Sequence, residues 1–173
     1  ALEMTQSRWR DDTRGRGVIT EIRTALGLVP EIAGDPGELR EVLTNLILNA
    51  VQHAPAESEV TVSICADSAK GSGRPTLHIA VRDCGAGFRE EDLARVFTPF
   101  FSRRPGGFGL GLAISERIVA EHRGRITAAN HTNAAMPIAA LRRETAATIS
   151  VAIDRNAIAA TRHAATRTPN LAK

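Results

Sequence analysis

Aromatic side chains are scarce in this chain of 173 residues, at 3% of the sequence with no tyrosine at all. The volume of any core must therefore come from Leu, Ile, Val and Ala. The two cysteines, Cys65 and Cys84, are too few for a disulfide framework and too far apart for a Cys-x-x-Cys site. No apolar run approaches the roughly 18 residues that a membrane-spanning helix needs, and the sequence opens without a signal-peptide pattern. We therefore expect no membrane segment in this chain and a reducing compartment around it.

A strong charge of either sign is also missing. The chain has 22 basic and 19 acidic residues, a formal net charge of +3, and the basic residues are spread out rather than gathered in blocks. A weak, dispersed excess does not favour nucleic acid, so we expect no nucleic-acid partner. The hydrophobic share of 43% is typical of a globular protein and, at this length, predicts one domain with a core.

Hydrophobic periodicity predicts both helices and strands. Apolar residues recur at intervals of three and four in two long segments, and they alternate in several shorter ones. The sequence predicts helices over 36–54, 89–96 and 110–122, and strands over 17–23, 59–65, 76–83, from Ile126 onward and over 148–153. Elements in this order predict an α+β fold, a two-layer α/β sandwich whose helices cover one face of the sheet.

Specific residues mark the ends of the two long helices. Asp35 suits the N-cap of the first helix and Pro36 its first turn, while Glu38 stands three residues after the cap, as in a capping box. Gly124 follows the second helix, where a left-handed residue commonly ends a helix. We therefore expect the first helix to begin at Pro36 and the second to end just before Gly124.

The first stretch with candidate functional residues lies on the first long helix. Asn45 and Asn49 are four residues apart, so their amides share a face with Glu41 one turn earlier. Carboxamide oxygens in a line are suitable ligands for a hard cation such as Mg²⁺. The alternative interpretation is a solvated polar stripe opposite the core.

The second stretch is Asp83-Cys84-Gly85-Ala86-Gly87, which follows an apolar strand. The two glycines let the backbone turn sharply and approach a ligand closely. A buried carboxylate at the strand end would accept a hydrogen bond from an exocyclic amine such as that of adenine. The alternative is an ordinary turn in which the aspartate caps local N–H groups.

The third stretch is rich in glycine and precedes the second long helix. Gly107, Gly109 and Gly111 free backbone N–H groups to face an anion, and the helix N-terminus adds partial positive charge. It is not a dinucleotide fingerprint, because Leu112 replaces the third glycine, and the Lys-Ser/Thr of a Walker A loop is missing. A plain hinge before a helix is the alternative.

The fourth stretch gathers the aromatic residues. All five phenylalanines lie between Phe88 and Phe108, around the glycine-rich segment. This clustering indicates either a mobile flap with apolar attachment points or a small satellite core. Arg103 or Arg104 would be able to reach phosphate oxygens from such a flap.

The order and spacing of these stretches resemble a known family. Asn-x-x-x-Asn-Ala, Asp-x-Gly-x-Gly, Phe-x-Pro-Phe-Phe and Gly-x-Gly-Leu-Gly-Leu are similar to the motifs of the ATP-binding catalytic domain of bacterial sensor histidine kinases. That domain belongs to the superfamily of DNA gyrase, the MutL-type ATPases and a chaperone ATPase branch. The resemblance covers residues 17–153 and implies a Bergerat-type sandwich, with a mixed sheet and the nucleotide under a flexible lid.

Carried onto this chain, the resemblance implies a site for ATP and Mg²⁺. Asn45 and Asn49 would be the catalytic and metal-binding residues, and Asp83 would accept the adenine amine. Phe97 and Phe100 would belong to the lid and its hinge. The full set of implied nucleotide-binding residues is Asn49, His53, Asp83, Gly85, Gly87, Arg103, Gly107, Gly109, Leu110, Gly111 and Leu112.

The resemblance also implies the reaction. Hydrolytic members of the superfamily have a water-activating glutamate where this chain has Asn45, and a neutral amide cannot accept that proton. The implied activity is protein-histidine kinase: transfer of the γ-phosphoryl group to a histidine on a separate dimerisation and phosphoacceptor domain, with a response regulator downstream. A non-catalytic nucleotide-sensing or interaction domain is the alternative, and a gyrase-type hydrolase is disfavoured.

Around this core, residues 1–16 are interpreted as a linker or helix end from an upstream phosphoacceptor domain, and residues 154–173 as a disordered tail. None of the five histidines has the His-Glu-x-x-x-Pro setting of a phosphoacceptor. Arg123 stands where the family usually has glycine. The expected location is the cytoplasm, alone or as the cytoplasmic part of a larger membrane-associated kinase.

Overall fold

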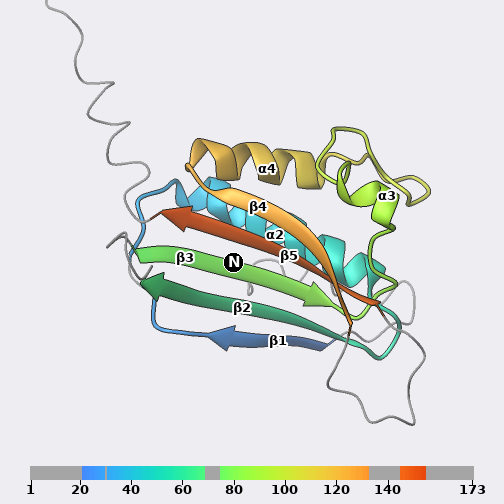
Figure 1. Cartoon of the computed structure of the whole chain (residues 1–173), viewed down its shortest axis with the longest axis horizontal. Helices are drawn as coiled ribbons and strands as arrows, with labels where there is room; N and C mark the ends of the chain where they lie inside the picture. The colour runs from blue at the N-terminus through green and yellow to red at the C-terminus, as the bar shows by residue number, and fades with distance from the viewer. Residues whose placement is uncertain (1–20, 30, 69–74, 133–144, 155–173) are drawn as a thin grey trace, which may run out of the picture.

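The computed structural model describes residues 21–29, 31–68, 75–132 and 145–154. They form a five-stranded sheet with two long helices on one face (Figure 1). The elements are β1 (Glu21–Leu26), α2 (Pro36–His53), β2 (Glu59–Ser68), β3 (Pro75–Asp83), α3 (Glu90–Leu93), α4 (Gly111–Glu121), β4 (Arg125–Thr132) and β5 (Thr145–Asp154). None of the helices in the described part of the chain is both long and apolar enough to cross a membrane.

The sheet is mixed, with the strand order β1-β2-β3-β5-β4. β1 runs parallel to β2, and the other neighbours are antiparallel. In the centre, Val81 of β3 pairs with Val62 of β2 on one side and with Ile149 of β5 on the other. The predicted α+β sandwich with a mixed sheet is therefore confirmed.

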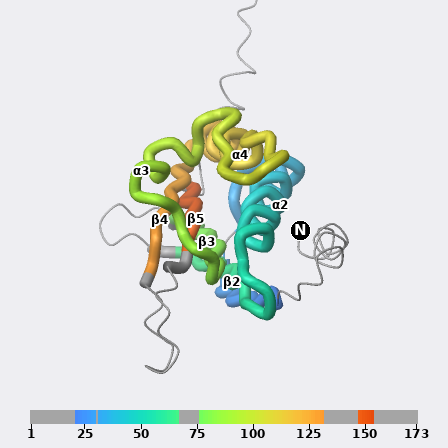
Figure 2. Tube along the Cα trace, turned by 90° about the vertical axis from the view of Figure 1, so that its right-hand side faces the viewer, coloured from blue at the N-terminus to red at the C-terminus, as the bar shows by residue number. Residues whose placement is uncertain are grey.

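The core lies between this sheet and the two long helices. α2 and α4 contact each other, and both contact the sheet, so that they form the second layer (Figure 2). Alternation in the strands and the three-four spacing in the helices bring Leu, Ile, Val and Ala to the common face. The buried residues that form this core are Val42, Leu46, Ile47, Ala50, Val51, Val60, Val62, Leu77, Ile79, Val81, Ile118, Val119, Ile126, Ile149, Val151 and Ile153.

The two long helices are tied together at the end of the sandwich far from the glycine-rich stretch. Asp35 is the N-cap of α2, and its Oδ1 accepts the N–H groups of Gly37 at 2.7 Å and Glu38 at 3.0 Å. In a capping box the backbone N–H of Asp35 would donate to the side chain of Glu38. Here it donates instead to Nε2 of buried His122, at 3.1 Å. The imidazole Nδ1 lies 2.8 Å from the carbonyl of Ile118, so His122 bridges the end of α4 to the start of α2.

The prediction of Gly124 as the left-handed residue is wrong. Arg123 takes that conformation, with φ at 52°, one residue earlier. A side chain with a Cβ is strained in this conformation, so the arginine carries local strain. Gly124 is required for a different reason, because a Cβ there would lie 2.6 Å from the carbonyl oxygen of Ala152.

Several predicted boundaries shift. β2 extends to Ser68, β3 begins at Pro75, and β5 runs from Thr145 to Asp154, so the predicted tail boundary at 154 falls inside a strand. The short helix α3 covers only Glu90–Leu93 of the predicted 89–96. β1 runs to Leu26, beyond the predicted strand end, and the interpretations for residues 1–20 and 155–173 lie outside the described residues.

Candidate functional site

A cavity of about 930 Å³ opens at the end of the sandwich where β3 ends and α4 begins. It is lined by α2, the end of β3, the loop into α3, the segment 101–110 and the first turn of α4. Of the predicted site residues, those that line it are Asn45, Asn49, His53, Asp83, Gly87, Arg103, Gly107, Gly109, Leu110, Gly111 and Leu112. Residues from four separate stretches of the sequence therefore meet at one cavity.

The face of α2 presents the two asparagines to this cavity. Asn45 donates from Nδ2 to the carbonyl of Gly111 at 3.3 Å, which fixes the amide and couples α2 to the start of α4. The side-chain amide of Asn49 has no hydrogen-bond partner in the described ranges, so its oxygen is available for a ligand. One turn on, exposed His53 lies with Nδ1 2.8 Å from the main-chain oxygen of Asn49.

Asp83 is a buried carboxylate at the end of β3. It is 4% exposed, and its Oδ1 accepts the N–H of Gly85 at 2.8 Å. Burial raises the pKa of this carboxyl, while the N–H of Gly85, the charge of His53 and the N–H of Ala147 act in the opposite direction. Burial of the Asp83 carboxylate costs desolvation free energy, and a hydrogen-bond donor on a ligand in the cavity would offset that cost.

The two glycines after Asp83 have different roles. Gly87 lines the cavity with φ at 72°, a conformation that glycine adopts without strain. Gly85 is the one predicted site residue that does not line the cavity. It is buried within the loop, where a Cβ would come within 2.5 Å of the His53 carbonyl oxygen and 2.7 Å of Asp83 Oδ1.

The loop that follows is held by a residue that the sequence did not single out. Asn130 of β4 accepts the N–H of Phe88 at 2.8 Å through Oδ1 and donates from Nδ2 to the Phe88 carbonyl at 2.7 Å. One amide therefore satisfies both polar groups of that peptide backbone and fixes a wall of the cavity. An asparagine within a strand carries no local signal of this role.

The segment from Phe100 to Gly109 closes on itself over the cavity. The Phe100 N–H donates to the Gly109 carbonyl at 2.9 Å. Gly109 has φ at 64°, and a Cβ there would lie 2.5 Å from the Phe101 carbonyl oxygen, so only glycine allows this closure. Phe97 packs against the core, whereas Phe100 and Phe108 are 77% and 83% exposed.

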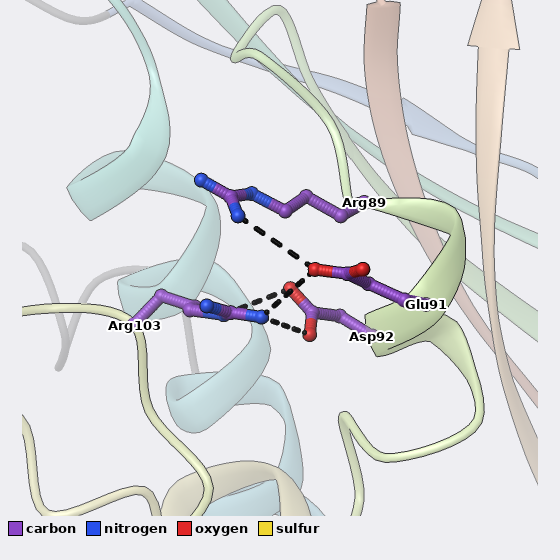
Figure 3. A network of polar contacts seen from close by, with 4 residues as sticks. All are labelled: Arg89, Glu91, Asp92 and Arg103. Atoms are coloured by element: carbon purple, nitrogen blue, oxygen red, sulfur yellow. Dashed lines mark hydrogen bonds and ion pairs between the residues drawn. The ribbon is translucent and has the colours of Figure 1, made fainter.

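Arg103 connects this segment to α3 (Figure 3). Its Nε and Nη2 donate to the two oxygens of Asp92 at 3.0 and 2.8 Å, and Nη2 also reaches Glu91 at 3.2 Å. Arg89 lies 3.7 Å from the same Glu91 carboxylate. The hydrogen bonds from Arg103 lower the pKa of Asp92, even though burial opposes this. Asp92 is thus a cavity-lining carboxylate that the sequence did not single out.

The first turn of α4 completes the floor of the cavity. Leu110 occupies the N-cap and has no side-chain acceptor to offer, so the first N–H groups of α4 lack a side-chain cap. Together with the helix dipole, these N–H groups favour an anion. A Cβ at the neighbouring Gly111 would lie 3.7 Å from Cγ of Asn45, an ordinary van der Waals distance.

Comparison with known proteins identifies a matching family. The model described as "Histidine kinase-, DNA gyrase B-, and HSP90-like ATPase" matches residues 34–157. The sensor histidine kinase ZraS of Klebsiella oxytoca is 41% identical over 107 residues, which cover 61% of this chain and 22% of that protein. The adaptive-response sensory kinase SasA of Synechococcus elongatus is 31% identical over 133 residues, which cover 75% of this chain and 32% of that protein. The chain therefore spans between a fifth and a third of these curated relatives.

Solved structures share the fold. The mycobacterial sensor histidine kinase MprB superposes with a TM-score of 0.67 at 23% identity, covering 88% of this chain and 93% of that chain. Full-length ShkA, whose structure is a complex with AMPPNP, superposes with a TM-score of 0.63 at 25% identity, covering 88% of this chain and 30% of that chain. The arrangement of sheet and helices is therefore that of known catalytic domains.

Proposed function

This chain belongs to the histidine kinase-, DNA gyrase B- and HSP90-like ATPase family, and we propose that it is the ATP-binding catalytic module of a two-component sensor histidine kinase. In this proposal it donates the γ-phosphoryl group of ATP to a histidine on a separate dimerisation and phosphoacceptor domain. The convergence of Asn49, Asp83 and Gly109 on one cavity is the observation that carries the proposal.

The adenine would bind at the end of β3. Asp83 supplies a buried acceptor for the exocyclic amine, and the clamped loop at Gly87 and Phe88 forms the adjacent wall. His53 borders the same region from α2. An amine donor would offset the desolvation of the Asp83 carboxylate, which gives a purine with such a group an advantage over one without it.

The triphosphate would lie between α2 and the closed segment 100–109. The backbone N–H groups of Leu110, Gly111 and Leu112 at the α4 N-terminus favour its negative charge, and Gly107 and Gly109 allow the backbone to come close. Arg103 lines the same cavity and supplies a guanidinium for phosphate oxygens.

The donor set at the asparagines fits Mg²⁺. The unpartnered Asn49 amide and the tethered Asn45 amide provide hard carboxamide oxygens on one helix face. Asn49 and Asn45 would hold the ion, which when bound supplies neutralisation of phosphate charge.

The chemistry would be transfer rather than hydrolysis. A nitrogen of the acceptor histidine attacks the γ-phosphorus in line, the bond from that phosphorus to the bridging oxygen breaks, and ADP leaves. Asn45 cannot take a proton from water, so the site has no general base at this position. The residues of this chain position the nucleotide and stabilise its charge.

The partners follow from this role. The phosphoacceptor domain acts upstream in the same protein or in trans, and a response regulator receives the phosphoryl group afterwards. We place the module in the cytoplasm, as a free protein or as part of a larger membrane-associated kinase, since ATP is supplied there. Cys65 and Cys84, both free thiols, are consistent with a reducing compartment.

The experiment is phosphoryl transfer in trans. The chain is mixed with γ-labelled Mg-ATP and an isolated phosphoacceptor domain, and label on the acceptor is followed with time. We expect label on the acceptor histidine, and none when that histidine is replaced by glutamine. Nucleotide binding without any transfer to a panel of acceptor domains would contradict the kinase role.

A further inference from the structure

Asp92 is a buried carboxylate that the proposed chemistry leaves without a role. Its side chain is 6% exposed, whereas the neighbouring Glu90 and Glu91 of α3 are exposed. A carboxylate in such a place needs a cationic or hydrogen-bonding partner. Asp92 has this partner in Arg103, which comes from the segment that closes over the cavity.

The ion pair between Arg103 and Asp92 uses the Nε and Nη2 edge of the guanidinium and does not use Nη1. Nε and Nη2 bind different oxygens of Asp92, and this bidentate arrangement fixes the plane of the guanidinium (Figure 3). The second contact of Nη2, with Glu91, is on the exposed side. Nothing in the described part of the chain accepts a hydrogen bond from Nη1, and Arg103 lines the cavity.

We infer that Asp92 is a positioning residue for phosphate recognition: it holds Arg103 by one edge against α3, so that the remaining Nη1 group binds a phosphate of the nucleotide. The inference rests on the proposed function, because it assumes that a nucleotide triphosphate occupies the cavity. It adds an indirect role for a side chain that does not itself touch the ligand.

A competing arrangement would have the phosphate pull Arg103 away from Asp92. The geometry of the pair argues against this, because departure of the arginine would break two charge-assisted hydrogen bonds and leave the Asp92 carboxylate without its cationic partner. Arginine also has five N–H donors in a rigid fork and can serve two anions at once. The two arrangements predict opposite effects of removing the Asp92 charge.

The test compares ATP with adenosine, both measured by equilibrium titration in the presence of Mg²⁺. We expect Asp92→Asn and Arg103→Ala each to weaken ATP binding by about tenfold and to leave adenosine affinity unchanged. The double variant should be no weaker than Arg103→Ala alone, because both changes remove one function. The matched control is Glu91→Gln, the exposed partner of the same guanidinium, with an expected change of less than about twofold.

Three results would overturn the inference: ATP affinity of Asp92→Asn equal to or tighter than the wild type, equal losses for ATP and adenosine, or additive losses in the double variant. If Asp92→Asn does not fold, Arg103→Lys replaces it, because lysine keeps the charge but cannot make the paired contact; the same selective loss for ATP is expected, and wild-type affinity would overturn the inference. A wild-type chain that binds neither ligand would contradict the proposed function itself, before any variant is compared.

Discussion

The side-chain amide of Asn130 holds both polar atoms of the Phe88 backbone, across 42 residues of sequence. This contact joins strand β4 to the loop that follows Asp83, and it fixes the wall of the cavity next to the proposed adenine position. The loop itself contains Gly85 and Gly87 and has no regular backbone pairing of its own. The Asn130 side chain therefore supplies the hydrogen bonds that a neighbouring strand would otherwise give to the backbone of Phe88.

Replacing Asn130 tests the clamp. In Asn130→Asp the carboxylate keeps the acceptor for the Phe88 N–H but places a second acceptor against the Phe88 carbonyl. We expect a loss of about 1–3 kcal/mol in the free energy of unfolding, measured in urea, and weaker nucleotide binding. Asn130→Ala removes both bonds without the repulsion and should be less damaging. Equal stability of the wild type and the aspartate variant would show that the clamp contributes nothing.

Asp83→Asn should separate stability from binding. Because burial raises the pKa of Asp83 in the folded state, the folded chain holds this proton more tightly than the unfolded chain. The ionised Asp83 therefore lowers the free energy of unfolding by its full amount above the pKa of the folded state. This destabilisation is relieved as the pH falls through that pKa towards the ordinary pKa of an aspartate. We expect the asparagine variant to be at least as stable as the wild type at pH 7, with the difference shrinking on acidification. Thermal unfolding between pH 4 and pH 7 measures this, and a variant destabilised at pH 7 would contradict it.

Two glycines of the closing segment provide a matched pair. Gly109 and Gly106 both have positive φ, at 64° and 76°, but an added Cβ meets the Phe101 carbonyl only at Gly109 and open space at Gly106. We expect Gly109→Ala to weaken Mg-ATP binding by about tenfold or more, because the backbone must move. Gly106→Ala should lose only about 1 kcal/mol of stability, from the strain of an alanine in the left-handed conformation, and should bind Mg-ATP nearly as well as the wild type. Similar affinities for the two variants would argue against a defined closed segment.

His122 lies at the opposite end of α4 from the cavity and should affect stability alone. His122→Phe keeps an aromatic ring of similar size but removes the acceptor for Asp35 N–H and the contact with the Ile118 carbonyl. The expected cost is about 1–3 kcal/mol in unfolding free energy. Nucleotide affinity, measured well below the unfolding transition, should be that of the wild type. A loss of nucleotide affinity without a loss of stability would contradict this prediction and would show that His122 acts on the nucleotide site.

The sequence predicted the elements whose signals are local. The three-four spacing of apolar residues located α2 and α4, and alternation located the central strands β2 and β3, because a side chain's face depends only on its neighbours in the same element. The Asp35 cap was predicted for the same reason. The cavity-lining asparagines and glycines were found through motifs that occupy single short stretches.

What the sequence did not predict depends on partners far along the chain. Arg123 instead of Gly124 takes the left-handed position, and Gly124 is needed for its close approach to Ala152 of a distant strand. The Asn130 clamp on Phe88 is of the same kind. Nothing in the sequence distinguishes Asp92 from the acidic residues beside it, because its partner Arg103 is brought to it only by the fold. Spacing within one sequence carries no signal for such contacts.

The central claim is that one cavity binds a magnesium-bound purine triphosphate through Asp83 at one end and Asn49 at the other. Isothermal titration of Mg-ATP into the wild type, Asp83→Asn and Asn49→Ala tests it most directly. The account predicts saturable binding at one site per chain, weakened about tenfold or more in each variant. Wild-type affinity in both variants would contradict it.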